Sequence, residues 1–332
     1  MVYIYKKIIG GKPYYYLRAS KRKGKRVIAK DIAFLGGSID EAKKSLNKLT
    51  EYKQEIRKSY RKINLFIESR YYRKKSEKLK SKKDIFLEEK LIDVEACKIH
   101  YNTKFKKENN LTREEIMKSF IIDFTYNTTS MEGNTISIDE ARNLLEDGRT
   151  PKDRTLREIY DLKNTEKVFL ELLYSKEEIT HELIQETHKK LMENIDPRIG
   201  YRTRDIRVTK SSFKSTPGIY VLTDMKLLLK WYHANKNKLH PLVLASIFHH
   251  KFEKIHPFMD GNGRTGRMLM NLILLRNDYP PVIVYEKLRS EYRNALRVAD
   301  KSNLLETDKK DYSTLAKFIA DQMITSYWDI FL

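Results

Sequence analysis

The sequence predicts a mainly α-helical protein, in which a helical bundle with an inserted β-hairpin follows a small β-hairpin and a basic helical region. Three observations support this fold class. From residue 111 onward, apolar residues recur at helical spacing in one segment after another. Residues 14–35 instead hold two strand-like runs around a glycine turn. Only 12 Gly and 8 Pro occur in 332 residues, so long irregular linkers are not expected.

Residues 1–37 are expected to form a β-hairpin module. Its strands are predicted at 14–20 and 27–35, and residues 21–26 form a basic turn around Gly24. One interpretation is a nucleic-acid contact, with basic side chains on phosphates and exposed tyrosines on bases. The other is a solvated turn in a hairpin that binds a protein or a second copy of the chain. The sequence leaves both open.

Positive charge is concentrated in the first third of the chain. Residues 1–110 hold 31 Lys and Arg against 13 Asp and Glu, a charge of +18, whereas the rest carries only +3. A polyanion such as nucleic acid is therefore a candidate partner of residues 1–110. Residues 38–110 are predicted to be a basic helical region, with one helix at 41–60, capped by Ser38 or Asp40, and another at about 63–99.

The remaining chain, residues 111–332, is predicted to form one helical core. Thr112 and Glu115 have the spacing of a capping box at its start. An interruption at 200–223 has β-type character and contains a Pro217-Gly218 turn. Further helices are predicted at 137–146, 156–174, 180–194, 223–235, 241–255, 263–277, 287–300 and 312–328.

Several classes of protein are not expected. No run of 18 apolar residues is present, which argues against a membrane-spanning helix. The first residues lack the apolar stretch of a secretory signal. The single cysteine, Cys97, cannot form an intrachain disulfide or a multi-cysteine zinc site. We therefore expect a cytoplasmic protein without membrane contact.

The most informative segment is the turn between the helices predicted at 241–255 and 263–277. Gly261, Asn262 and Gly263 allow a tight turn and close backbone approach, and the amides that open the next helix form a natural anion site. Arg264 and Arg267 lie three residues apart, so both are expected to reach the same side of the first turn and to bind phosphate.

Two further residues complete this segment. Asp260 offers a hard oxygen ligand for a Mg²⁺ ion shared with phosphate oxygens. His256 precedes the turn, and a neutral imidazole there could accept a proton from a hydroxyl group. A base, a metal ligand and an anion cradle together indicate phosphoryl or nucleotidyl transfer. The alternative is a structural loop whose arginines cap neighbouring helices.

The segment from His256 to Arg267, HPFMDGNGRTGR, resembles the Fic-family signature His-x-Phe-x-Asp/Glu-Gly-Asn-Gly-Arg-x-x-Arg. The similarity extends over about residues 112–330. It implies a Fic-type bundle and a protein adenylyltransferase, which moves AMP from ATP to a Ser, Thr or Tyr hydroxyl of a protein. It also implies that residues 207–220 form a β-hairpin flap over the target and that Tyr292 lies near the nucleoside.

By the same resemblance, His256 would be the catalytic base and Asp260 would hold Mg²⁺. The cradle would consist of Gly261, Asn262 and Gly263, and the outer phosphates would contact the two arginines, Arg264 and Arg267. Relatives of this kind are commonly homodimers.

A second string, Thr128-Thr129-Ser130-Met131-Glu132-Gly133, resembles the family's inhibitory motif, Ser/Thr-x-x-x-Glu-Gly/Asn. From the residues alone, Thr128 could cap a helix and Glu132 could be an ordinary surface residue. The resemblance implies an inhibitory helix near 127–135, in which Glu132 pairs with Arg267 and blocks productive ATP binding. Such a protein could modify itself.

Three other functions remain open. Glu132 could assist the reverse reaction, the removal of AMP from a modified protein. The protein could be a regulator that binds nucleic acid through residues 1–110, and the Fic core would then only modulate this function. A metal-dependent phosphohydrolase is suggested by His249, His250, His256 and Asp260, although their spacing is not that of a helical metal hydrolase.

Overall fold

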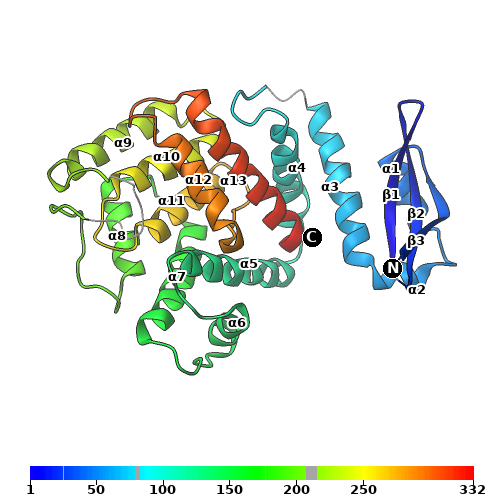
Figure 1. Cartoon of the computed structure of the whole chain (residues 1–332), viewed down its shortest axis with the longest axis horizontal. Helices are drawn as coiled ribbons and strands as arrows, with labels where there is room; N and C mark the ends of the chain where they lie inside the picture. Colours follow the sequence, from blue (N-terminus) through cyan, green and yellow to red (C-terminus); the bar gives the residue numbers. More distant parts are fainter. Residues whose placement is uncertain (25, 80–82, 176, 207–214) are drawn as a thin grey trace.

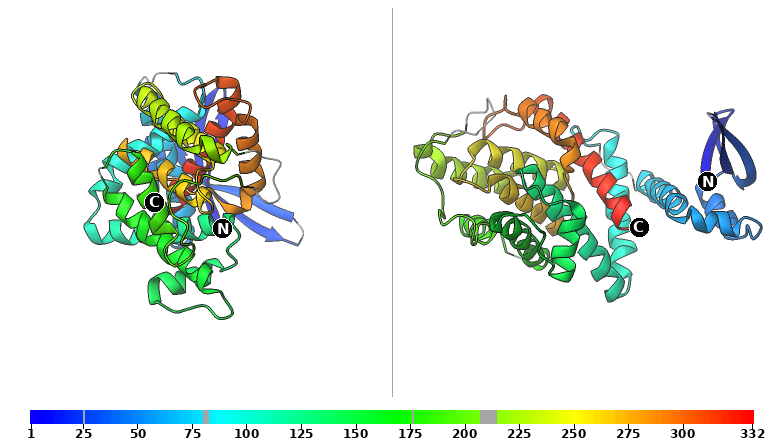
Figure 2. Two further views of the ribbon diagram at one scale, coloured as in Figure 1. Left: turned by 90° about the vertical axis from the view of Figure 1, so that its left-hand side faces the viewer. Right: turned by 60° about the horizontal axis from the view of Figure 1, so that its bottom comes forward.

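The computed structural model describes residues 1–24, 26–79, 83–175, 177–206 and 215–332. A three-stranded sheet lies at one end of the molecule, and a helical body makes up the rest (Figure 1). Helix α3 (Tyr60–Lys78) runs between the two parts, and the views in Figure 2 show the same arrangement. The mainly helical class is confirmed.

The N-terminal sheet is antiparallel, with the order β1 (Val2–Ile9), β2 (Lys12–Lys23) and β3 (Arg26–Gly36). The sequence predicted only the hairpin of β2 and β3. The additional strand β1 pairs with β2 through a turn at Gly10 and Gly11, whose φ angles are +55° and +76°. Two residues with positive φ match the turn that joins twisted antiparallel strands.

The expected helix at 41–60 is wrong as a single element. Helix α1 (Ile39–Leu46) is capped by Ser38, one of the two predicted caps, whose hydroxyl accepts a hydrogen bond from the Glu41 amide. The chain then leaves the helix near Asn47 and resumes in the short α2 (Lys53–Lys58) before α3. Asn, Thr and similar residues compete for backbone hydrogen bonds, which favours a break at this point.

The expected helix at 63–99 is also interrupted. Between α3 and α4 (Lys90–Thr103), the carboxylate of Asp84 accepts hydrogen bonds from the amides of Phe86 and Leu87, at 2.8 and 2.9 Å. Such side-chain bonds offer the backbone an alternative to a continuing helix.

An apolar cluster that includes Val2, Leu17 and Ile67 lies under the sheet, whereas the main core begins with Tyr72 further along α3.

The helical body contains nine further helices in the part of the chain that the structure describes. They are α5 (Asn110–Met131), α6 (Ile138–Asp147), α7 (Leu156–Tyr174), α8 (His181–Leu191), α9 (Val221–Asn235), α10 (Pro241–Ile255), α11 (Asn262–Arg276), α12 (Arg289–Ala299) and α13 (Lys309–Ile330). Short 3₁₀ turns occupy Phe105–Lys107, Gly218–Tyr220 and Glu286–Leu288.

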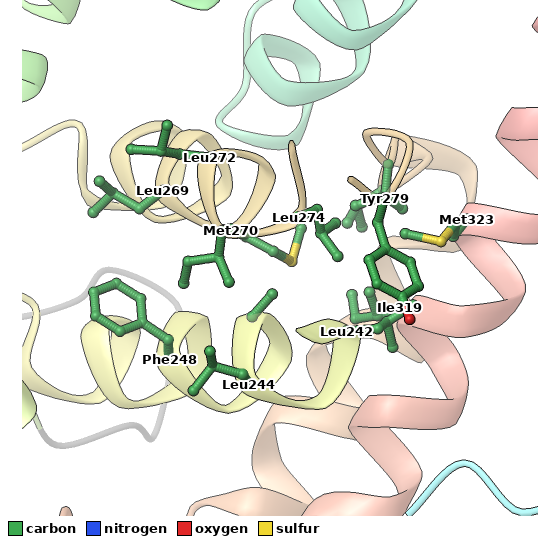
Figure 3. Packing of buried hydrophobic residues seen from close by; sticks show 14 of the residues in the cluster. Leu242, Leu244, Phe248, Leu269, Met270, Leu272, Leu274, Tyr279, Ile319 and Met323 are labelled. Carbon is green, nitrogen blue, oxygen red and sulfur yellow. The ribbon is translucent and has the colours of Figure 1, made fainter. Parts of the chain in front are cut away.

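Helix α11 is the centre of the body. All residues from Asn262 to Leu274 are buried, so the helix is enclosed on every side. Figure 3 shows its apolar residues facing Leu244 and Phe248 of α10, with α13 closing the cluster through Ile319 and Met323. The beginning of α11 is therefore held in a rigid setting, which suits a site that must be positioned accurately.

Two other expectations concern the start of the core and the flap. Helix α5 is capped by Asn109, whose side chain accepts a hydrogen bond from the Thr112 amide at 2.9 Å, so the predicted capping box of Thr112 and Glu115 is wrong.

The flap expected at 207–220 falls largely on residues 207–214, which lie outside the described residues. On its flanks, residues 200–206 and 215–220 form no strand.

None of the helices that the structure describes is both long enough and apolar enough to span a lipid bilayer.

Candidate functional site

The loop between α10 and α11 carries the candidate site. Helix α10 ends at Ile255 because His256 adopts a left-handed conformation, with φ of +54°, and Pro257 has no amide hydrogen with which to continue the helix. A positive φ is uncommon for a residue other than glycine and is kept only where surrounding contacts fix it. His256 is therefore placed by contacts from outside the loop.

Those contacts come from Arg202, a buried residue that the sequence analysis did not select. Its guanidinium donates to the carbonyl oxygens of His256 (2.8 Å), Arg204 (2.8 Å), Thr216 (2.5 Å) and Ile255 (3.2 Å). Guanidinium groups offer five donors in a fixed plane, which suits this role. No motif near Arg202 signals the role, because its partners include residues more than 50 positions away.

The imidazole of His256 is largely buried, with 20% of the side chain exposed. Burial lowers the pKa of His256, while the negative charge of Glu132 acts in the opposite direction. The ring is therefore neutral at physiological pH, as a proton acceptor must be. Its Nδ1 lies 3.9 Å from Oε2 of Glu253, another residue that the sequence analysis missed.

Glu253 lies on α10 below the loop. Burial raises the pKa of Glu253 to about 8, and the neighbouring charge of Glu132 acts in the same direction. Its carboxyl group is thus mainly protonated at neutral pH. An alanine Cβ at Gly266 would lie 3.0 Å from Oε1 of Glu253 and 2.7 Å from Nδ1 of His249, which explains why a glycine faces them from α11.

The turn before α11 is closed by Asn262 and Gly261. The side chain of Asn262 donates to the carbonyl of Phe258 (2.9 Å) and accepts from its amide (2.8 Å). Gly261 has φ of +76°, and a Cβ there would lie 2.7 Å from Sδ of Met192. The Asn262 side chain thus shapes the turn, and the backbone amides at the start of α11 are the groups there that could bind an anion.

The two arginines of the loop, which the spacing predicted to reach the same side of the first turn, are bound to different helices. Arg264 forms a buried ion pair with Asp161 of α7. Arg267 instead donates to the hydroxyl of Thr128 on α5 at 2.7 Å and to its carbonyl at 3.0 Å. Helices α7 and α5, which both pack on α11 and also on each other, provide these partners, and the local spacing cannot reveal them.

Arg267 also binds Glu132, as the resemblance implied. Its Nη2 lies 2.6 Å from Oε1 of Glu132. Thr128 is inside α5 rather than at its start, and Glu132 follows the last residue of that helix, so the expected N-cap is wrong. Thr128 and Glu132, one turn apart at the C-terminal end of α5, both contact Arg267, so the glutamate lies at the first turn of α11.

Glu132 lies directly over the backbone of the cradle. A Cβ built on Gly263 would be 2.1 Å from Oε1 of Glu132. Desolvation raises the pKa of Glu132, but the charge and hydrogen bond of Arg267 outweigh it, so the net pKa is lowered and the group is ionised. A carboxylate thus lies at the N-terminus of α11, where helix amides favour an anion.

Asp260 projects from the same loop and is paired with Arg157 of α7. Its Oδ1 accepts the Gly261 amide hydrogen at 2.6 Å. Burial raises the pKa of Asp260, whereas Arg264, the Gly261 amide and Arg157 lower it, and the net pKa falls. Its backbone carbonyl is contacted by Nε2 of His188 at 3.0 Å.

Asp260 fits a Mg²⁺ ion only in combination with phosphate. The described residues contain no group of three or more His, Cys, Asp or Glu that could hold a metal ion. Mg²⁺ often uses one or two carboxylates together with substrate phosphates and water, so a single ionised aspartate beside an anion cradle is compatible with it. The Arg157 side chain would have to release an oxygen of Asp260.

Tyr292 is buried beneath the site. Its hydroxyl is hydrogen-bonded to Nε2 of His249, and its ring stacks on Phe318 with centroids 5.9 Å apart. His250 contacts a different partner, Oδ1 of Asp300, at 3.0 Å. The adjacent histidines His249 and His250 therefore point to separate surroundings, which does not favour a shared metal site of a phosphohydrolase.

Comparisons with known proteins show which sequences and folds this chain resembles. A model of the Fic/DOC family matches residues 178–274. The protein adenylyltransferase fic-1 of Caenorhabditis elegans is 34% identical over 195 residues, which cover 57% of this chain and 38% of the relative. The protein adenylyltransferase Fic of Drosophila melanogaster is 32% identical over 221 residues, covering 64% and 43%.

Solved structures show a similar fold. A Fic-domain-containing signalling protein from Bacteroides thetaiotaomicron superimposes with a TM-score of 0.63 at 24% identity, over 70% of this chain and 95% of the other. Residues 134–508 of Fic-1 from C. elegans give 0.61 at 29% identity, over 73% and 71%. The chain spans about two fifths of the length of the curated relatives it matches.

Proposed function

We propose that this chain is a protein adenylyltransferase of the Fic/DOC family, whose model matches residues 178–274, and that Glu132 holds this activity back. The reaction transfers AMP from ATP to a Ser, Thr or Tyr hydroxyl of a protein. One observation supports this best: a loop fixed by the core brings a neutral imidazole, a helix N-terminus and Arg267 together around a carboxylate anion. Phosphate is the anion that such a cradle suits.

In the proposed reaction, His256 accepts the proton of the target hydroxyl as its oxygen attacks the α-phosphorus of ATP. A new oxygen–phosphorus bond forms, and the bond to the bridging oxygen of the β-phosphate breaks. Pyrophosphate leaves with the negative charge, which the amides of α11 and the guanidinium of Arg267 stabilise. A Mg²⁺ ion, if held by Asp260, would neutralise charge on the phosphates.

Glu132 opposes this reaction in two ways. Its carboxylate forms a charge-assisted hydrogen bond with Arg267, which takes that guanidinium away from phosphate. The same carboxylate lies over Gly263 and would repel a phosphate placed on the cradle. ATP would then bind with its outer phosphates displaced, in a geometry unsuited to in-line attack.

The proposal is tested with ATP labelled either in its α-phosphate or in its γ-phosphate. Glu132→Gly is expected to transfer the α-label to protein, and Glu132→Gly/His256→Ala to transfer none while still binding ATP. Glu146→Gly, at an exposed glutamate near the end of α6, is the matched control and should behave like wild type. Transfer of only the γ-label would show a phosphotransferase and contradict the proposal.

Removal of AMP from a modified protein is a second candidate reaction at the same site. It is favoured by the ionised and partly exposed carboxylate of Glu132, which could orient a water molecule toward the phosphorus. Under this alternative, the wild type should release AMP from protein modified by Glu132→Gly, and Glu132→Gly should not. Equal release by both would exclude a role of Glu132 in hydrolysis.

A further inference from the structure

The N-terminal sheet has one covered and one uncovered face. Val2, Ile4, Tyr15 and Leu17 are buried in the apolar cluster that the sheet shares with α1 and α3. Lys6 and Tyr15, on that side, line a cleft together with Trp328 of α13. Because side chains alternate along strands, the intervening residues lie on the opposite side. We call this side the outer face; it comprises Tyr3, Tyr5, Lys7, Tyr14, Tyr16, Arg18, Arg22 and Phe34.

Aromatic rings form a row across the outer face. Tyr5, Tyr16 and Phe34 are direct neighbours in the register of the three strands. The rings of Tyr16 and Phe34 are 5.3 Å apart, and the Arg18 guanidinium lies 3.6 Å above the ring of Tyr5. Phe34 is 57% exposed and Tyr5 36%. Water-exposed aromatic rings in such a row are a common feature of binding surfaces.

The charge of the sheet identifies the chemistry of a partner. Residues 1–37 contain ten Lys and Arg but one acidic residue, Asp31. That carboxylate is already paired with Arg18, Nε to Oδ1, at 2.6 Å. At the tip of the β2–β3 hairpin, Lys21, Arg22, Lys23 and Arg26 are exposed and form no ion pair with any described residue. A second copy of the same face would be repelled, whereas a polyanion would be attracted.

We propose that the outer face binds single-stranded nucleic acid. Bases would stack on Tyr16, on Phe34 and on the Arg18 guanidinium that covers the ring of Tyr5, and phosphates would follow the basic hairpin toward Arg22. On β2, Tyr16 and Arg22 are six positions apart, which is about 20 Å along an extended strand. This distance leaves room for several nucleotides. Flat aromatic rings beside a basic track are typical of single-strand binding, because every base has a stacking face that a duplex hides.

This inference concerns a surface separate from the Fic loop. It does not rest on the proposed adenylyl transfer, and its test needs no ATP. The full chain is titrated against fluorescently labelled 12-nucleotide probes of one sequence as RNA, as DNA and as duplex DNA. Fluorescence anisotropy at several KCl concentrations gives the dissociation constants and their salt dependence.

The expected result is tighter binding of a single strand than of the duplex, with RNA and DNA distinguished by their relative affinities. Phe34→Ala and Tyr16→Ala should each weaken single-strand binding about tenfold. Arg22→Ala should weaken it and reduce the salt slope by about one. Tyr174→Ala, at an exposed tyrosine at the end of α7, and Lys310→Ala, at an exposed lysine of α13, are matched controls expected to bind like wild type.

Three outcomes would overturn the inference. Tighter binding of the duplex than of both single-stranded probes would contradict base stacking on the outer face. Unchanged binding by both Phe34→Ala and Tyr16→Ala, in proteins whose circular dichroism and melting temperature match wild type, shows that the rings take no part. A dimer in sedimentation analysis that Phe34→Ala converts to monomer assigns the face to a second copy instead.

Discussion

Glu132 and Arg267 lie 135 residues apart in the sequence, yet their side chains form a hydrogen-bonded ion pair of 2.6 Å at the start of α11. The guanidinium is also bound to the hydroxyl and carbonyl of Thr128, one turn earlier on α5. The ion pair therefore belongs to a fixed helix–helix contact. Under the proposed function, this carboxylate would keep the Arg267 guanidinium from a bound phosphate.

The contact between Glu132 and Gly263 can be tested in solution by a double-mutant cycle. Gly263→Ala places a methyl group against Oε1 of Glu132 and should destabilise the wild type by about 1–3 kcal/mol. In the Glu132→Gly background only Nη1 of Arg267, 3.0 Å from the added Cβ, remains close, and alanine also favours a helix over glycine, so the loss should be clearly smaller. Urea unfolding measures both values. Equal losses in the two backgrounds would show that the groups do not touch.

Arg157→Ala should make Mg²⁺ activation easier. The variant frees Oδ2 of Asp260, so the Mg²⁺ concentration for half-maximal AMP transfer should fall several-fold in the Glu132→Gly background. Both side chains are partly exposed, so stability should change by less than about 1 kcal/mol. Arg142→Ala, at an exposed arginine of α6, is the matched control. An unchanged Mg²⁺ requirement argues against Asp260 as the ligand.

The pH dependence of transfer should reflect His256. Burial lowers its pKa below the ordinary 6.5, so the neutral base prevails at pH 7 and activity is lost as the pH falls through the lowered value. Glu132→Gly removes a charge that raises this pKa, and its acidic limb should lie at lower pH than that of the wild type. The acidic limbs of the wild type and of Glu132→Gly are measured from the pH dependence of kcat/KM of each protein. A limb above pH 7 contradicts the assignment of His256 as the base.

Arg202→Ala should disable the loop by releasing His256 from its strained conformation. Four carbonyl oxygens lose a charged donor, which should destabilise the protein by about 3 kcal/mol. If the variant remains folded, kcat should fall more than KM rises, because the base is misplaced while the cradle stays intact. Arg198→Ala, at a nearby exposed arginine paired with Asp196, is the control. A pure KM effect would contradict a positioning role.

The sequence revealed features that depend on local patterns. The helix limits of α7 and α10 follow apolar periodicity, and the glycine turn of the loop is apparent from Gly261 to Gly263. Strand β1 was missed because its Gly10-Gly11 turn lies in a short segment with weak alternation. The pairing of Glu132 with Arg267 came only from the resemblance, since no local pattern connects them.

Long-range contacts account for most of the remaining differences between the sequence-based predictions and the structure. Arg264 binds Asp161 and Arg202 binds the loop carbonyls across 50 to 103 positions, so their roles depend on the packing of whole helices. The spacing of Arg264 and Arg267 indicated a shared side, but it could not show that Asp161 of α7 binds one arginine and Glu132, after α5, binds the other. Burial of α11 on every side decides which partner each arginine meets.

The most direct test of the central claim is the intact mass of the Glu132→Gly protein after incubation with ATP and Mg²⁺, beside wild type and Glu132→Gly/His256→Ala. A target protein need not be known if the chain modifies itself, and added lysate proteins extend the measurement to other acceptors. The account predicts a gain of one or more AMP masses on Glu132→Gly or an acceptor, little on wild type, and none with the double variant. Equal AMP incorporation by wild type and Glu132→Gly, or incorporation that survives the loss of His256, would contradict it.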